Sequence, residues 1–297
     1  MAGTLIVIGT GLTLGAFASG VYAQVSVRDD TGYEVRLPAH ARRIVTLAPH
    51  AAELAHAAGA GGRIVGTVSG ASDPSLPRDL VVVGDVHALD LERIVSLKPD
   101  LIVSWPYTTP AQVAKLRERG LPVFITDPRT IDGIATNIER LGTLAGTPDA
   151  AAKSAAQFRA QIAQAIPPSI DRRVRVFYQI WNTPLFTIGA DHMITQALTA
   201  CGGDNVFASI AIPAPQVSVE AVIAARPEAI IAGTDGAKRP VWLEDWSKWP
   251  GLPAVRDRLL LVVDADRLHR PGPRFAEGVG QLCDAMARAR TTKRPDR

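Results

Sequence analysis

The chain has 297 residues, 47% of them hydrophobic, and its 32 Lys and Arg residues against 29 Asp and Glu give a formal net charge of +3. This length allows two domains, or one large α/β unit, with sizeable buried cores. The basic residues are scattered and do not alternate with aromatic residues, a pattern that argues against a nucleic-acid-binding surface.

The chain begins with MAGTLIVIGTGLTLGAFASGVYAQ, in which an apolar run from Leu5 to Phe17 is followed by small residues. Val21 to Gln24 has the small-x-small pattern of a signal-peptidase site. The apolar run is shorter than the roughly 18 residues of a transmembrane helix. The segment therefore predicts a signal peptide over residues 1–23 and export of the mature protein.

After the signal peptide, short apolar runs alternate with amphipathic ones, and this alternation predicts a parallel sheet covered by helices. We expect an N-terminal α/β lobe over residues 24–146. Its predicted strands cover 42–48, 63–68, 80–84, 99–105 and 121–126, and its predicted helices cover 49–62 and 109–120.

Residues 130–166 contain two long helical patterns with no strand between them. The second predicts an inter-lobe helix over 147–167, with Thr147 as its N-cap and Pro148 at its first helical position. A helix of about 19 residues spans roughly 28 Å. That length is enough to bridge two lobes.

The α/β alternation then restarts and predicts a C-terminal lobe over 168–297. Its predicted strands cover 173–181, 228–233 and 259–265, and its predicted helices cover 191–203, 219–225 and 274–290.

One stretch occurs twice: LERIVSLKPDLIVSW at 91–105 has a near copy, VEAVIAARPEAIIAG, at 219–233. The copy indicates that the two halves of the chain are duplicated. The predicted fold class is therefore α/β, with two Rossmann-like lobes that contain parallel sheets and are joined by one long α-helix. The copies differ at their ends, Trp105 against Gly233, which predicts one aromatic wall and one open wall in the cleft between the lobes.

Each copy also places a glutamate two residues after an N-cap candidate, Glu92 after Asp90 and Glu220 after Ser218. An acidic residue in the first turn of a helix is stabilised by the helix macrodipole, and this alone accounts for both. Two carboxylates at matching positions on two related lobes are also suited to a partner with basic residues. The spacing does not choose between these interpretations.

Cys201 and Cys283 are the two cysteines. In an oxidising compartment they are natural disulfide partners. The bond would close a loop of about 80 residues, worth on the order of 4 kcal/mol in the chain-entropy model. Two buried free thiols are the alternative.

Six segments taken in order resemble the substrate-binding proteins of cobalamin (vitamin B12) ABC importers, over nearly all of residues 42–290. The segments are APHAAELAHAAGAG, LDLERIVSLKPDLIVSW, LFTIG, CGGDNVF, APQVSVEAVIAARPEAII and HRPGPR with QLC. The resemblance implies a monomeric periplasmic receptor, not an enzyme, that binds its ligand in the cleft between two lobes and docks on a transmembrane permease dimer. It implies docking through Glu92 and Glu220, a disulfide between Cys201 and Cys283, and a corrinoid as ligand, with no resident cofactor.

The resemblance also implies ligand-binding positions. These are Pro49, Trp105, Phe186, Asp266 and Arg270. Trp105 ends a predicted strand, and ligands of α/β sheets lie beyond the carboxyl ends of strands. Three further candidates lie where cleft loops are expected: His50, His87 and His269. Trp181 is a fourth candidate, which would compensate from the second lobe for missing aromatic walls. Core packing of the aromatic residues and a solvated, salt-bridged loop around Arg274 are the alternatives.

The chain departs from the family at three aromatic positions. Ala214 replaces a tryptophan, another tryptophan is missing near Val86, and SGASDPSLP at 69–77 lacks a tyrosine. These losses favour an alternative ligand, a ferric siderophore or haem. An alternative of another class is a tetrapyrrole metal chelatase with His50, His87 or His269 as its metal-handling group. No HxH or HExxH spacing supports a preformed site, and no metal site is predicted.

Overall fold

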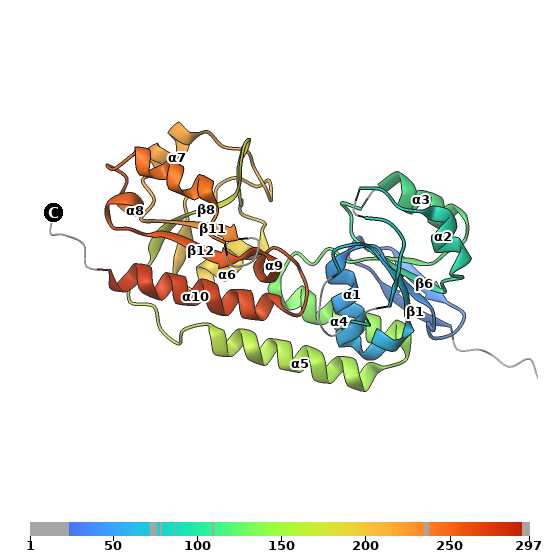
Figure 1. Cartoon of the computed structure of the whole chain (residues 1–297). Helices are drawn as coiled ribbons and strands as arrows, with labels where there is room; N and C mark the ends of the chain where they lie inside the picture. The colour runs from blue at the N-terminus through green and yellow to red at the C-terminus, as the bar shows by residue number, and fades with distance from the viewer. Residues whose placement is uncertain are drawn as a thin grey trace, which may run out of the picture.

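The computed structural model of the chain describes residues 24–71, 76–77, 79–85, 87–108, 110–234 and 238–292. They form two α/β lobes that lie side by side above a long helix (Figure 1). The predicted signal peptide, residues 1–23, lies outside the described residues. No helix of the described part has the length and hydropathy required to cross a bilayer.

The first lobe contains a five-stranded parallel sheet in the order β5-β4-β3-β6-β7. Its strands are β3 (Ile44–Thr46), β4 (Ile64–Thr67), β5 (Val81–Val82), β6 (Leu101–Ser104) and β7 (Val123–Ile125). Every residue of β6 is buried, as expected for a central parallel strand covered on both faces. An antiparallel hairpin, β1 (Val25–Arg28) and β2 (Glu34–Leu37), precedes the sheet and was not predicted.

Helices and short helical turns cover this sheet. They are α1 (Pro49–Ala55), the π-helical turn η1 (His56–Ala60), the 3₁₀ turn η2 (Gly61–Arg63), α2 (Leu91–Ser96), α3 (Pro110–Glu118) and α4 (Ile131–Ala145).

The second lobe has parallel strands in the order β10-β8-β11-β12, with β9 paired antiparallel to β8. The sequence had predicted a wholly parallel sheet, and the antiparallel strand β9 shows that this prediction was wrong for the second lobe. The strands are β8 (Val174–Asn182), β9 (Leu185–Thr187), β10 (Gly203–Asn205), β11 (Ala229–Thr234) and β12 (Leu260–Asp264). The helical elements are α6 (Met193–Ala200), α7 (Val219–Ala225), the 3₁₀ segment η3 (Val241–Lys248), α8 (Pro253–Arg256), α9 (Ala265–Leu268) and α10 (Phe275–Thr291).

The two sheets share one topology. In chain order, β3, β4, β6 and β7 correspond to β8, β10, β11 and β12, and the strand order across each sheet is the same. The repeated sequence forms α2 and β6 in one lobe and α7 and β11 in the other. The duplication inferred from the sequence is therefore also a duplication of fold, and the predicted fold class is confirmed.

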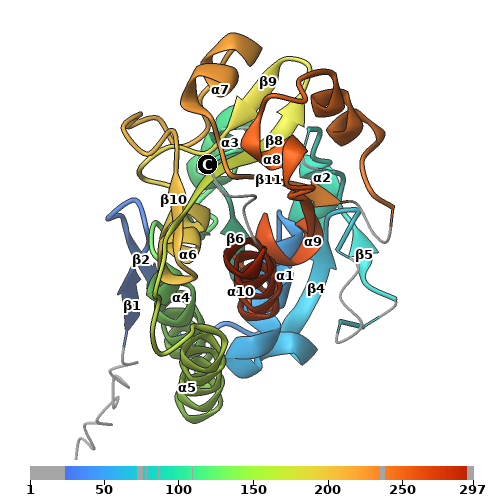
Figure 2. The same ribbon diagram turned by 90° about the vertical axis from the view of Figure 1, so that its left-hand side faces the viewer.

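The long helix α5 (Pro148–Ala165) lies within the predicted range 147–167 and begins with Pro148, as predicted. It runs beneath both lobes and packs on α4 and α10 (Figures 1 and 2). Thr147 occupies the N-cap position, as predicted, but its side chain makes no capping bond, because its hydroxyl donates to the carbonyl oxygen of Ala58 at 2.6 Å. The division into lobes at 24–146 and 168–297 remains our proposal for the domains.

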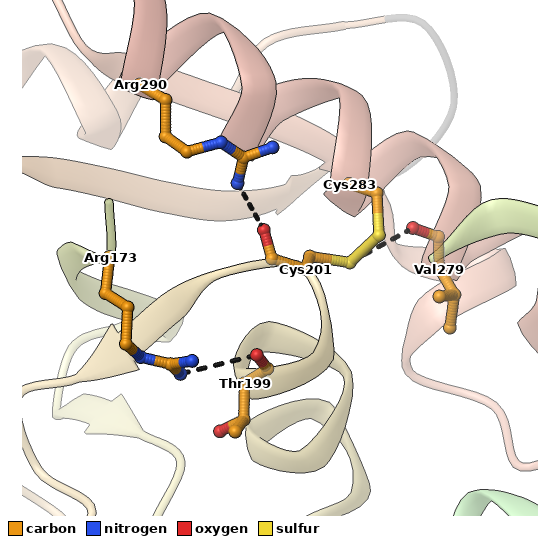
Figure 3. The surroundings of a disulfide bond; sticks show 6 residues. All are labelled: Arg173, Thr199, Cys201, Val279, Cys283 and Arg290. Atoms are coloured by element: carbon orange, nitrogen blue, oxygen red, sulfur yellow. Dashed lines mark hydrogen bonds between the residues drawn. A yellow bond between two sulfur atoms is a disulfide. The ribbon is translucent and has the colours of Figure 1, made fainter. Parts of the chain in front are cut away.

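A disulfide joins Cys201, at the end of α6, to Cys283 in α10, with their Cα atoms 4.7 Å apart (Figure 3). Arg290, in the last turn of α10, donates to the carbonyl oxygen of Cys201 at 2.5 Å. Both interactions fasten α10 to the end of α6 within the second lobe. The described residues contain no free cysteine.

Among the described residues, polar side chains connect the lobes at two places. Arg274, the residue before α10, pairs with Glu53 of α1 at 2.7 Å. Elsewhere, the side-chain amide of Gln196 in α6 donates to the carbonyl oxygen of Arg129 at 2.8 Å and accepts from the backbone N–H of Ile131 at 3.3 Å. These contacts and α5 set the separation of the lobes, and hence the width of the space between them.

Candidate functional site

A cavity of about 490 Å³ lies between the lobes. The first lobe contributes Trp105, Tyr107, Asp127, Pro128 and Arg129, and the second contributes Ile180, Asp191, His192, Met193, Ile194, Ile212, Pro213, Ala214, Leu268, His269 and Pro271. Cavities of this size are typical of small-molecule sites, as is a mainly apolar lining with a few polar groups. Trp105 and His269 are the two predicted ligand residues in this lining.

Trp105 follows the carboxyl end of β6, as predicted. Its ring meets His50 edge-on, with centroids 5.1 Å apart, and Tyr107 at 4.7 Å. Edge-to-face contacts of this kind are favourable because the positive edge of one ring meets the negative face of the other. His50 and Tyr107 therefore hold the indole as a wall of the cavity.

The opposite wall is occupied, contrary to the prediction of an open one. A Cβ atom at Gly233 would lie 2.5 Å from Cε1 of His269, so the missing side chain leaves room for that imidazole. The Nε2 atom of His269 lies 2.8 Å from the hydroxyl of Tyr178, which is fully buried. The indole of Trp105 on one lobe thus faces the same cavity as the imidazole of His269 on the other, and Gly233 leaves room for that imidazole.

One corner of the cavity is polar, and sequence reasoning missed it. Asp127 and Arg129 of the first lobe form an ion pair at 2.5 Å, and Asp191 and His192 of the second lobe line the same cavity. His192 is the N-cap of α6, where its Nδ1 accepts from the backbone N–H of Ile194 at 3.1 Å. The sequence signal that could have identified this corner is the polar pair of Asp191 and His192, directly before the apolar helix α6.

Three histidines, the buried His50 and the half-buried His192 and His269, have strongly lowered pKa values. Burial lowers the pKa of His50 to about 3, and the nearby Arg270 guanidinium adds to the effect. Burial lowers the pKa of His192 to about 4, with smaller contributions from His269 and Arg129. The pKa of His269 is also lowered to about 4 by burial, against an opposing effect of Asp264. All three rings are therefore neutral at pH 7.

Acid is expected to destabilise the protein through these histidines. Because their folded pKa values lie below the unfolded value of about 6.5, the unfolded chain binds more protons at lower pH, and stability falls as pH drops from 6.5 toward 4. At pH 5.5 each should cost about 1 kcal/mol. His50→Leu should remove one such contribution from the difference in unfolding free energy between pH 7.5 and 5.5, measured by urea denaturation. An unchanged difference would contradict a neutral, buried His50.

The other predicted ligand residues lie outside the cavity lining. Asp266 and Arg270 form an ion pair with each other at 2.9 Å. A second guanidinium nitrogen of Arg270, Nη1, is buried and has no hydrogen-bond partner among the described residues. The pair thus keeps one donor for another group, which is compatible with the predicted role.

The remaining predicted residues occupy varied environments. Pro49 opens α1 and is half-buried, and Phe186 is a half-buried residue of β9 that bridges to Gln216. Trp181 is 58% exposed, and its indole N–H donates to the carbonyl oxygen of Thr183. His87 is exposed, and its backbone N–H donates to Asp85. The roles of these residues stay predictions.

Of the three missing aromatic positions, the structure places one. Ala214, which stands where the resemblance implies a tryptophan, lines the cavity with a small side chain. Val86 and residues 72–75 lie outside the described residues. In the described part of the chain, no group of three or more His, Cys, Asp or Glu side chains is arranged to hold a metal ion.

Glu92 and Glu220 are exposed in the first turns of α2 and α7. Their predicted N-caps are confirmed: Asp90 accepts from the backbone N–H of Arg93 at 2.9 Å, and Ser218 from that of Ala221 at 3.2 Å. Figure 1 shows α2 and α7 on different lobes but on the same side of the molecule, away from α5. The helices that carry the two exposed glutamates therefore lie on one side of the molecule.

Similar proteins agree with this architecture. A curated vitamin B12-binding protein of Vibrio campbellii is 33% identical over 248 residues, which cover 82% of this chain and 89% of the relative. The crystal structure of the periplasmic vitamin B12-binding protein BtuF of Vibrio cholerae is 33% identical, with a TM-score of 0.74, over 84% of this chain and 98% of that one.

A haem-binding structure is also similar. The periplasmic heme-binding protein RhuT from Roseiflexus sp. RS-1, in its apo form, is 29% identical, with a TM-score of 0.72, over 84% of this chain and 98% of that chain. Residues 44–266 match the family described as "Periplasmic binding protein". With two similar lobes, a cavity between them and this match over most of its length, the chain belongs to the periplasmic binding protein family.

Proposed function

We propose that the protein is a periplasmic receptor that captures cobalamin or a related corrinoid in the cavity between its lobes and delivers it to the permease of an ABC importer. The main support for this proposal is the cavity that both lobes line. The chain also shares 33% identity with a vitamin B12-binding relative over most of its length. Membership of a binding-protein family favours capture and delivery over catalysis.

The lining suits such a ligand. A corrinoid is a broad, largely apolar disc with a fringe of amides, so its site requires apolar walls and a few hydrogen-bonding groups. Trp105, Ile180 and Leu268 provide apolar walls, while the polar corner around Arg129 and His192 faces the same space. The free guanidinium nitrogen of Arg270 is suited to an amide oxygen.

We further propose that Glu92 and Glu220 dock the receptor on a permease dimer, that the protein acts as a monomer, and that residues 1–23 direct its export. Their exposure on one side of the molecule supports the docking role of the two glutamates. The polar contacts of Arg274 and Gln196 between the lobes, together with α5, support a receptor that opens only slightly when it binds and releases its ligand.

Direct titration tests the ligand. The mature protein should bind cyanocobalamin with quenching of tryptophan fluorescence, because Trp105 lines the cavity. No quenching and no heat of binding at micromolar cyanocobalamin would overturn the proposed ligand. Haem and ferric siderophores, titrated in parallel, show whether another chelate binds instead.

Trp105→Ala should weaken cyanocobalamin binding at least about tenfold, because an aromatic wall that loses its ring forfeits most of its contact area. Isothermal titration calorimetry measures the change. Tyr33→Ala is the matched control, since Tyr33 is an exposed aromatic residue outside the cavity lining and should leave the affinity unchanged. Equal affinities of the two variants would exclude Trp105 from the ligand site.

Haem is the second candidate ligand, and one observation favours it. Ala214 leaves the cavity without the tryptophan that the corrinoid-binding family has there, and a haem-binding structure shares 29% identity with the chain. Haem binding would appear as a shift of the Soret band on titration. Tight haem binding without cyanocobalamin binding would assign the receptor to haem.

A further inference from the structure

The protonation of His192 is fixed by its position. Nδ1 accepts a hydrogen bond from the backbone N–H of Ile194. A ring nitrogen that accepts from an amide carries no proton, so the single proton of the neutral ring lies on Nε2. Among the residues that the structure describes, this Nε2 has no hydrogen-bond partner, and the ring lines the cavity.

His192 remains neutral under ordinary conditions. Its burial and the positive or titratable groups that act on it, His269 and Arg129, all disfavour the imidazolium and lower its pKa to about 4. A neutral ring with its proton on Nε2 donates one hydrogen bond and cannot ligate a metal through that nitrogen. His192 is therefore equipped as a donor.

The charges around this donor discriminate between possible acceptors. Asp127 is paired with Arg129, whereas Asp191 is an exposed carboxylate on the same cavity. Two carboxylates and one guanidinium leave this corner with one net negative charge. A ligand carboxylate would be repelled there, while an uncharged carbonyl oxygen would be accepted.

We propose that His192 is a specificity-determining residue, a hydrogen-bond donor of fixed tautomer that selects an uncharged carbonyl group, such as a corrinoid side-chain amide, at the polar corner of the cleft. This inference rests on the proposed function for the identity of the ligand. The tautomer of His192 and the charge of the polar corner do not depend on which ligand binds.

Two substitutions separate binding from helix capping. His192→Ser keeps an oxygen that can accept from Ile194 but removes the donor, so it should leave the melting temperature nearly unchanged and weaken cyanocobalamin binding about tenfold. His192→Gln keeps a donor of similar reach but caps poorly, so it should lower the melting temperature by a few degrees and retain most of the affinity. Wild-type affinity in the serine variant would overturn the proposal.

The choice of amide over carboxylate is tested on the ligand. Cyanocobalamin should bind more tightly than each of its monocarboxylic acids, in which one peripheral amide is hydrolysed, and one regioisomer should lose about tenfold or more. Asp191→Asn should reduce that loss, because it removes the repelling charge. A loss that Asp191→Asn leaves intact would show that the corner does not select by charge.

Ring-nitrogen NMR of the ligand-free protein tests the donor without any ligand. The His192 ring, assigned by the signal missing in His192→Gln, should show a protonated Nε2 and no titration above pH 5.5. A protonated Nδ1, or titration near pH 6.5, would overturn the fixed donor. Absence of cyanocobalamin binding by the wild type would instead overturn the proposed function and the corrinoid as the source of the carbonyl.

Discussion

Replacing both Glu92 and Glu220 by alanine is expected to abolish ligand uptake by cells that depend on this receptor, while the affinity of the purified protein for cyanocobalamin changes less than about twofold. Both side chains are exposed in the first turns of helices on separate lobes, and neither lines the cavity. Their removal withdraws two charges from the docking surface, where charge complementarity governs the encounter and the register of partners. Each single variant should have an intermediate effect.

The matched control replaces two exposed acidic residues of other helices, Asp149 of α5 and Asp284 of α10, by alanine. It removes the same charge and should leave uptake intact. Loss of an exposed acid at a helix N-terminus removes only a solvent-screened interaction with the helix dipole, so stability is not limiting. If the Glu92 and Glu220 variant loses ligand affinity in proportion to uptake, the two residues serve the cleft rather than docking.

The sequence was sufficient for the architecture because each lobe is specified locally. The continuous apolar run 101–103 is typical of a strand buried on both faces, and the capping residues Asp90 and Ser218 mark where the repeated helices begin. The hairpin of β1 and β2 escaped prediction because it consists of two four-residue strands, each too short to show a clear period.

The cleft was only partly predictable, because its composition depends on how two separately folded lobes meet. Trp105 could be placed, since the end of a parallel strand points into such a cleft in either lobe. The meeting of Asp127 with His192 depends on contacts such as that of Gln196 with residues 129–131, which no periodicity encodes. Likewise, the sequence shows that Gly233 lacks a side chain but not that His269 occupies its space.

Glu53→Ala is expected to lower the free energy of unfolding by about 3–5 kcal/mol. Glu53 is only 3% exposed, and Arg274, its partner across the lobes, is 23% exposed. Truncating one member of a buried ion pair leaves the other charge desolvated, and this penalty exceeds the net contribution of the pair. Guanidinium denaturation measures the change. Glu34→Ala, which breaks an exposed pair with Arg36 at 2.6 Å, is the control and should cost far less, because solvent screens an exposed pair.

The same substitution tests the link between the lobes. Opening of the cleft must separate α1 from the residues that precede α10, and the Glu53 to Arg274 pair opposes that motion. By X-ray scattering, the wild type should show nearly the same radius of gyration with and without ligand, and Glu53→Ala should expand when ligand is absent.

Replacing both partners, as in Glu53→Gln with Arg274→Met, should restore much of the stability because no unpaired buried charge remains. A cost below about 1 kcal/mol for Glu53→Ala would show that α5, rather than this pair, holds the lobes together.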